Sequence, residues 1–232
     1  RVYLTYKNNI SEDVSFKFQS DIDYKNSPVN LYLKKAQLDW KSPIGKIILG
    51  MQEMNVFNVT EKNWGFRFIE KSPMDKHGFS SSADMGIGYS IGKSNRLNYS
   101  FLITNGTGYK NQENDKFKKI SMQVVYGQKK LVKKDGFNIG VSLSGESYEI
   151  ITEAVEASCS DGMSNQTDCT GELAWNFGSA ENTELYNNTV MSFFGGFSVN
   201  SFRFGGEFDI HRLQENQTKE IIAFYASYKA TD

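Results

Sequence analysis

Apolar and polar residues alternate along most of the chain with a period of two, which is the pattern of β-strands. The alternation predicts strands at residues 1–7, 14–23, 31–40, 45–54, 81–92, 96–104, 118–127, 136–148, 189–199, 202–213 and 218–229. No stretch sustains a 3.6-residue apolar period, and the best helical alternative, residues 149–157, is short. The sequence therefore predicts an all-β fold.

The two faces of these strands differ in character. One face is apolar throughout, as at Leu97 and Phe101, whereas the other is polar or small, as at Gly86, Gly88 and Ser90. A soluble antiparallel sheet also alternates, so alternation alone does not separate it from a membrane barrel. The long strands, the aromatic residues near strand ends and the Gly- and Ser-rich polar face favour a barrel with a lumen.

Short and long connections alternate between the predicted strands. The short ones are 8–13, 41–44, 93–95, 128–135 and 200–201; the long ones are 24–30, 55–80, 105–117 and 149–188, and only 214–217 breaks the trend. Bacterial barrels place short turns on one side of the membrane and long loops on the other. We therefore expect an antiparallel up-and-down transmembrane β-barrel.

The predicted strand count also bears on domain organisation. Residues 1–232 are expected to form a single β-barrel domain, because all-β domains of this length occur without splitting. Eleven predicted strands is an odd number, whereas single-chain bacterial barrels have even numbers. The interpretation is a barrel that lacks strands at one or both ends of the sequence.

Composition narrows the class of partner. The 26 basic and 27 acidic residues give a net charge of −1 without a basic tail, which argues against nucleic acid. Aromatic residues reach 14%, led by 17 Phe and 12 Tyr, as expected for strands. No apolar run reaches the length of about 18 residues that a helical membrane span needs.

Candidate bond-making chemistry is sparse. The only histidines, His77 and His211, lie outside any metal-ligand motif, and neither GxSxG nor HExxH occurs. We therefore predict no enzyme activity, no metal and no cofactor. Cys159 and Cys169 share the polar stretch CSDGMSNQTDC, which predicts a local disulfide in an oxidising compartment, with two free thiols as the alternative.

Several stretches resemble the phosphate-selective porin O and P superfamily within the trimeric porins. They are RVYLTYKNNISEDVSFKFQSDID, LYLKKAQLDWKSPIGKIILGMQEM with its Pro-x-Gly turn, NWGFRFIEKSPMDKHGFSSSADMGIGYS and LNYSFLITNGTGYKNQENDKFKKISMQVVYG. The resemblance covers roughly residues 1–145. It implies a bacterial outer-membrane channel, a homotrimer in lipid, a complete barrel of sixteen to eighteen strands, and a long early loop that constricts the lumen.

The resemblance places the constriction in residues 55–80. Charged residues of both signs occur there, which favours a transverse field: Glu61, Lys62, Arg67, Glu70, Lys71, Asp75, Lys76 and His77. A solvated external loop is the alternative for these charges. Arg67 is the best single candidate, because Phe66 and Phe68 flank it and could anchor it.

The polar strand faces supply a second set of candidates. Charges facing lipid near the midplane would cost about 2–4 kcal/mol for Lys or Arg, so these residues are expected to face the lumen. They are Lys17, Asp21, Lys35, Asp39, Arg203, Glu207, Asp209 and His211. Acids are as frequent as bases among them, so phosphate selectivity is not carried over from the family.

The function that the sequence predicts is passive diffusion of small hydrophilic solutes or ions through a water-filled channel. One alternative is a secreted β-sandwich or lectin-like module that uses Asp161, Asn165 and Asp168 for calcium. Another is an adhesive outer-membrane barrel with a plugged lumen. A barrel requires detergent or lipid, whereas a sandwich is soluble in plain buffer.

Overall fold

The protein forms one antiparallel sheet in which each strand pairs with its neighbours in the sequence. The computed structural model describes residues 2–23, 30–92, 96–113, 116–152, 182–213 and 217–230. The eleven strands are β1 (Val2–Asn9), β2 (Val14–Asp23), β3 (Asn30–Ser42), β4 (Gly45–Glu53), β5 (Ala83–Gly92), β6 (Arg96–Thr104), β7 (Lys119–Gly127), β8 (Gly136–Thr152), β9 (Asn182–Val199), β10 (Phe202–Arg212) and β11 (Thr218–Tyr228). The predicted all-β, up-and-down barrel architecture is confirmed.

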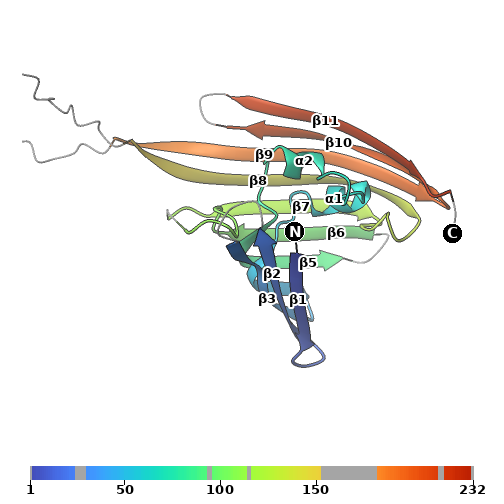
Figure 1. The fold of residues 1–232 in the computed structure, drawn as a ribbon, viewed down its shortest axis with the longest axis horizontal. Coiled ribbons are helices and arrows are strands. Elements are labelled where there is room, and N and C mark those ends of the chain that lie inside the picture. Colours follow the sequence, from blue (N-terminus) through green and yellow to red (C-terminus); the bar gives the residue numbers. More distant parts are fainter. Residues whose placement is uncertain are drawn as a thin grey trace, which may run out of the picture.

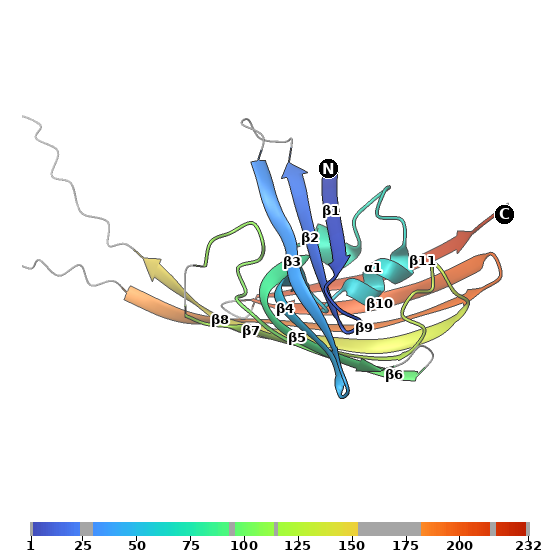
Figure 2. The same ribbon diagram turned by 90° about the horizontal axis from the view of Figure 1, so that it is seen from below.

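The sheet curls strongly. Strands β1–β3 rise steeply from the floor formed by β8–β11, and the two short helices lie inside the curve (Figures 1 and 2). These helices are α1 (Asn58–Trp64) and α2 (Pro73–Lys76). Among the described residues, β1 and β11 do not pair with each other, so the sheet is an open trough. We call the face that carries the helices the concave face and the opposite one the convex face.

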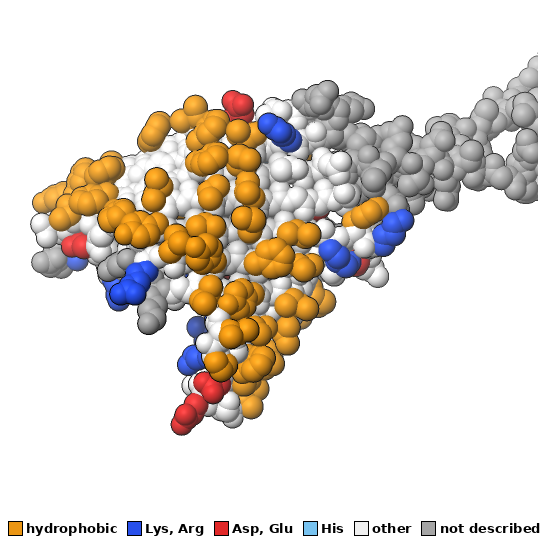
Figure 3. Space-filling view, turned by 180° about the vertical axis from the view of Figure 1, so that it is seen from behind, with side chains coloured by type: hydrophobic (Ala, Val, Ile, Leu, Met, Phe, Trp, Pro, Cys, Tyr) orange, Lys and Arg blue, Asp and Glu red, His pale blue; other side chains and the backbone are white. Residues whose placement is uncertain are grey.

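The apolar positions of the strands lie on the convex face. On β6, Leu97, Tyr99, Phe101 and Ile103 are each 41–46% exposed, whereas the alternate residue Asn98 is only 6% exposed. Hydrophobic side chains gather in patches and bands over the face opposite the helices (Figure 3). A soluble sheet would bury its apolar face, so this arrangement fits a wall that meets lipid outside and a polar interior inside.

Strict alternation fails at one point of β3, where a β-bulge shifts the register. Gln19 of β2 pairs with Lys35, but the next residue, Ser20, pairs with Leu33. Lys34 and Lys35 therefore both contact groups of the concave side, while Leu33 is 40% exposed. A bulge re-aims side chains in this way, because it inserts one unpaired residue into a strand.

The predicted connection 149–188 is too long at both ends. Pairing between β8 and β9 continues past the expected strand ends, to Thr152 opposite Asn182. Residues 149–152 are consequently strand, and the helical alternative for 149–157 is wrong over that part. Main-chain pairing does not require alternating side chains, so a hairpin can extend beyond the stretch that the alternation pattern marks. Cys159 and Cys169 lie outside the described residues.

Neither helix within the described residues has the length and apolar character needed to cross a membrane.

Candidate functional site

The connection between β4 and β5, residues 54–82, folds back against the concave face, and we call it the inner loop (Figure 2). Two apolar clusters attach it to the wall. One consists of Val56, Phe57, Met74, Phe79 and Val190, with the partly buried Ile221; the other consists of Val59, Val125 and Phe194. Burying each large side chain contributes about 1.5–3 kcal/mol. A solvated external loop does not fit this burial.

A buried amide fixes the start of the inner loop to β6 and β7. Asn55 is 1% exposed, and its Nδ2 donates to the carbonyl oxygen and to Oγ of Ser100 at 3.2 and 3.1 Å. Its Oδ1 accepts from Ser121 Oγ at 2.8 Å, and its main-chain oxygen accepts from Gln123 Nε2 at 2.6 Å. Both ends of the amide are thus satisfied by the wall, as a buried polar group requires.

A second amide pair holds α1 to β8. Asn63 and Asn138 each donate Nδ2 to the other's Oδ1 at 2.9 Å, and Asn138 Nδ2 also donates to the main chain of Gln128 at 2.6 Å. The helix ends at Gly65, whose φ of 73° is left-handed. A side chain there would collide with Val132, so glycine satisfies both conformation and space.

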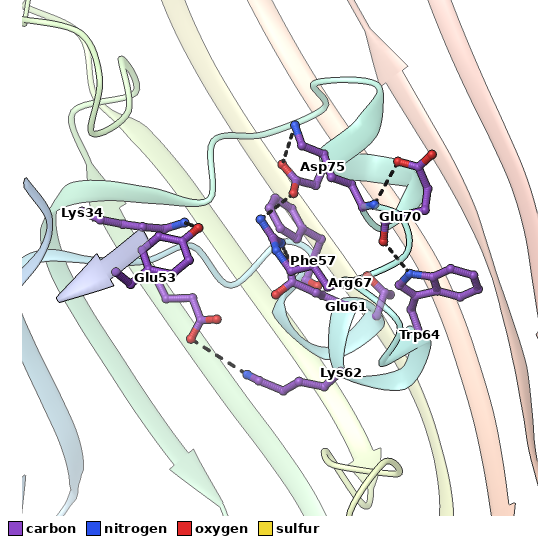
Figure 4. Close-up of polar contacts among 12 residues, drawn as sticks. Lys34, Glu53, Phe57, Glu61, Lys62, Trp64, Arg67, Glu70 and Asp75 are labelled. Atoms are coloured by element: carbon purple, nitrogen blue, oxygen red, sulfur yellow. Dashed lines mark hydrogen bonds and ion pairs between the residues drawn. The ribbon is translucent and has the colours of Figure 1, made fainter. Parts of the chain in front are cut away.

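Ion pairs connect charged side chains within the inner loop to one another (Figure 4). Arg67 contacts Glu61 and lies 2.9 Å from Asp75, while Lys71 lies 3.9 Å from Asp75. Carboxylates rather than aromatic rings therefore anchor Arg67. Phe66 instead contacts Arg203, whose guanidinium carbon lies 5.1 Å from the ring centroid.

A further ion pair joins the segment between the two helices to α2. Lys76 Nζ lies 3.1 Å from Glu70 Oε2, and Trp64 Nε1 donates to the main-chain oxygen of Glu70 at 3.0 Å. The hydrogen bond from Lys76 lowers the pKa of Glu70, as does a main-chain hydrogen bond from Lys71. His77 follows α2 and donates its main-chain N–H to Pro73. Glu70 therefore stays ionised to a lower pH than an isolated glutamate.

Near the start of the inner loop, charged side chains of the strands lie opposite charged side chains of the loop. Glu53 Oε2 lies 3.8 Å from Lys35 Nζ and 3.9 Å from Lys62 Nζ, so it bridges the wall and α1. Asp39 pairs with Lys46 at 3.0 Å. These groups, except Lys62, line a cavity of about 400 Å³.

The remaining wall candidates divide between that cavity and the floor under the inner loop. Lys17 lines the cavity. Arg203 and Glu207 are 9% and 8% exposed, and Arg203 donates to the main chain of Trp64 at 3.1 Å. Asp21 is fully buried and accepts from Tyr109 at 2.8 Å. Arg203 and Glu207 are thus largely covered by packed elements, although Glu207 lines one cavity and Arg203 another.

Two more β10 residues lie in the same covered region. Asp209 is fully buried, and His211 lies 2.5 Å from Asn188 Oδ1 with its ring 4.9 Å from that of Phe79. The part of the chain that the structure describes contains no group of three or more side chains placed to hold a metal.

Sequence reasoning missed the residues that attach the inner loop. Asn55, Asn63 and Glu53 were not singled out, and neither were Lys7 and Lys129, which line the cavity. A signal was present in the segment MNVFNV, residues 54–59, where four apolar residues interrupt a supposedly solvated loop. Apolar residues inside a long polar connection indicate that it packs against something.

The curled antiparallel sheet, the apolar convex face and the loop folded against the concave face define an outer-membrane β-barrel fold. A solved structure of a similar fold is a loop L8 deletion mutant of OmpT, an outer membrane protein of Vibrio cholerae. It has a TM-score of 0.59 and 13% identity, with 99% of this chain and 68% of that chain covered.

A second solved structure, described as a porin, gives a TM-score of 0.36 at 7% identity, covering 99% of this chain and 81% of that chain. At that score the second likeness carries no weight, so the fold assignment rests on the first. No protein-family model matches the chain, and no curated protein matches its sequence.

Proposed function

We propose that this protein is an outer-membrane porin, a water-filled channel for passive diffusion of small hydrophilic solutes or ions, without enzyme activity. The observation that carries the proposal is the attachment of the inner loop to the concave face by Asn55 and Asn63. A loop held inside a barrel by buried hydrogen bonds narrows the lumen at a fixed place. Selectivity in such channels follows from the width and the charges at the narrowest point.

The charges of the inner loop suit that role. Arg67 with its two carboxylates places both signs on the inner loop, and Lys62 of the loop pairs with Glu53 of β4. Positive and negative side chains beside the narrowed passage produce an electric field across it. Fixed charges surrounded by low-dielectric protein act strongly on passing ions. Glu61, Lys62, Arg67, Glu70, Lys71 and Lys76 are the proposed constriction residues, with Lys17, Lys35 and Asp39 on the facing wall.

The two alternatives to an open porin are a secreted β-sandwich and a plugged adhesive barrel. A secreted β-sandwich needs a second sheet over the apolar face, but the described residues form a single sheet whose convex face is exposed, which argues against that fold. Its candidate calcium residues, Asp161, Asn165 and Asp168, lie outside the described residues. A plugged adhesive barrel shares the fold and differs in whether the passage is open. The low exposure of Arg203 and Glu207, with Arg203 bonded to the main chain of Trp64 in the inner loop, is the observation that favours plugging.

The proposal also includes an outer-membrane location, a homotrimer and membership of a porin family. The likeness to an outer membrane protein supports an outer-membrane location. The apolar convex face supports contact with outer-membrane lipid, and part of it could serve a homotrimer. Membership of the phosphate-selective porin O and P superfamily, with a complete barrel of sixteen to eighteen strands, rests on the resemblance within residues 1–145.

The test is single-channel recording of the full-length protein in a planar bilayer. The proposal predicts discrete ohmic current steps, and steps that arrive in groups of three would support a trimer. Absence of conductance from protein that is demonstrably folded and inserted would refute the open channel and favour the plugged barrel. An inserted, heat-modifiable band on a gel provides the folding control.

A further inference from the structure

A cavity of about 320 Å³ lies between the inner loop and the last two strands of the floor. Trp64 of α1 and Pro73 of α2 line it from the side of the inner loop. Glu207 of β10 and Tyr225 of β11 line it from the side of the sheet. We call this space the floor cavity.

Glu207 brings a buried carboxyl group without a counter-charge to the floor cavity. It is 8% exposed, and its Oε2 has no hydrogen-bond partner among the described residues. No lysine or arginine of the described residues forms an ion pair with Glu207, and the negative charge of Asp209 acts on it as well. Burying a carboxylate without a cation is costly, because the group loses its hydration. A positive group beside Glu207 Oε2 would offset that cost.

The two lysines that line the floor cavity are paired with other acids. Lys76 lies 3.1 Å from Glu70, and Lys71 lies 3.9 Å from Asp75. Their side chains are 51% and 45% exposed, so water hydrates their ammonium groups, in contrast to the carboxyl group of Glu207. The cavity therefore has one buried negative group that the protein itself does not neutralise.

Aromatic and apolar side chains form much of the remaining lining. The rings of Trp64 and Tyr225 meet edge to face with their centroids 6.3 Å apart, and Pro73 and Ile221 also border the cavity. Such walls suit an organic cation, because aromatic faces attract positive charge and apolar groups cover a carbon skeleton. A metal ion is a poorer fit, since no three His, Cys, Asp or Glu side chains converge within the described ranges.

We propose that the floor cavity binds small organic ammonium compounds with an apolar body. Glu207 accepts a hydrogen bond from the ammonium group, and Trp64 and Tyr225 pack against the carbon skeleton. The inference goes beyond the proposed function, because a compound can bind there whether or not the channel is open. The bound compound contacts both α1 and the floor strands, so it also stabilises the attachment of the inner loop.

The test is saturation-transfer NMR of 2-phenylethylammonium with the folded full-length protein in a deuterated detergent. The comparison compounds are 2-phenylethanol and phenylacetate, which keep the ring but replace the ammonium by a neutral or a negative group. We expect the ammonium compound to bind about tenfold more tightly than the alcohol, because a hydrogen bond between charged groups is stronger than one to a neutral hydroxyl. Phenylacetate should bind more weakly than the alcohol, because Glu207 repels it.

The variant Glu207→Gln removes the negative charge at nearly the same side-chain volume. It should weaken binding of the ammonium compound about tenfold and leave binding of the alcohol unchanged. Glu12→Gln, the same substitution at an exposed position of the β1–β2 turn, is the matched control and should change nothing. Because Glu207→Gln removes a buried charge without a partner, it should unfold at the same or a higher urea concentration than the unmodified protein.

Two results would overturn the inference. One is equal affinity of the unmodified protein for the ammonium compound and the alcohol, and the other is equal affinity of Glu207→Gln and Glu12→Gln for the ammonium compound. A channel that conducts but does not bind the ammonium compound leaves the proposed function intact and removes the floor-cavity site. Binding without conductance retains the site and removes the open channel.

Discussion

Removal of the Asn55 side chain should loosen the inner loop from the barrel wall. Asn55→Ala deletes the two donor contacts to Ser100 and the acceptor contact to Ser121, all in a site where the residue is 1% exposed. At a net value of about 1 kcal/mol for each bond, the loss is about 3 kcal/mol. That corresponds to a factor of about 100 in the equilibrium between the attached and detached loop.

Hydrogen exchange read by mass spectrometry measures this equilibrium in the folded protein, because local opening limits exchange of protected amides. The reporters are the α1 amides of Glu61 and Gly65, which donate at 2.9 Å to Phe57 and Glu61. They should exchange about 100-fold faster in Asn55→Ala. Asn58→Ala is the control, since Asn58 Oδ1 has no hydrogen-bond partner among the described residues. Equal protection in both variants would refute the reasoning.

Three further outcomes follow from the same contacts. The losses of unfolding free energy caused by Asn63→Ala and Asn138→Ala should be non-additive, because each substitution removes the same reciprocal pair of hydrogen bonds. The coupling energy in urea unfolding should be about 1–2 kcal/mol. Additive losses would contradict the pairing. Phe101→Arg, in the middle of β6 on the convex face, should destabilise the protein in liposomes by about 2–4 kcal/mol, unlike Phe101→Leu. The contribution of Lys129 to ion preference in a salt gradient should be lost at a pH below the ordinary lysine value of about 10.4, because burial lowers the pKa of Lys129. Lys129→Gln should remove that part of the pH dependence, and an unchanged pH profile would contradict the reasoning.

Strand positions were readable from the sequence because a wall between lipid and a polar interior imposes a period of two. Strand β6 was predicted at its observed bounds, Arg96–Thr104, and the apolar side of β5–β7 is the convex face. The alternation pattern did not predict the bulge at Lys34 and Lys35. A bulge shifts which residues face each side of the sheet without changing the amino-acid composition of the strand. The outer part of the β8–β9 hairpin was missed because its sequence does not alternate, although its main chain pairs as far as Thr152 and Asn182.

The sequence predicted which segment would form the candidate site but not the contacts that hold the segment in place. A long charged connection at residues 55–80 was expected to constrict a lumen through its position in the chain, and the structure places it on the concave face. Its contacts with Ser121, Gln123 and Asn138 cross many residues of sequence, so no local pattern encodes them. The excess of lysines around the cavity beside the inner loop was hidden for the same reason, because Lys7 and Lys129 are far apart in the sequence and meet only in the folded sheet.

The most direct test of the account asks whether the inner loop borders the path of permeating ions. Lys62→Cys places a thiol on α1, where the native side chain is 37% exposed, and a charged methanethiosulfonate reagent is applied while single-channel current is recorded. The unmodified protein, with Cys159 and Cys169, and Lys133→Cys serve as controls. The account predicts a stepwise fall in current for Lys62→Cys alone. Complete modification of that cysteine, verified by mass, with unchanged current would contradict it.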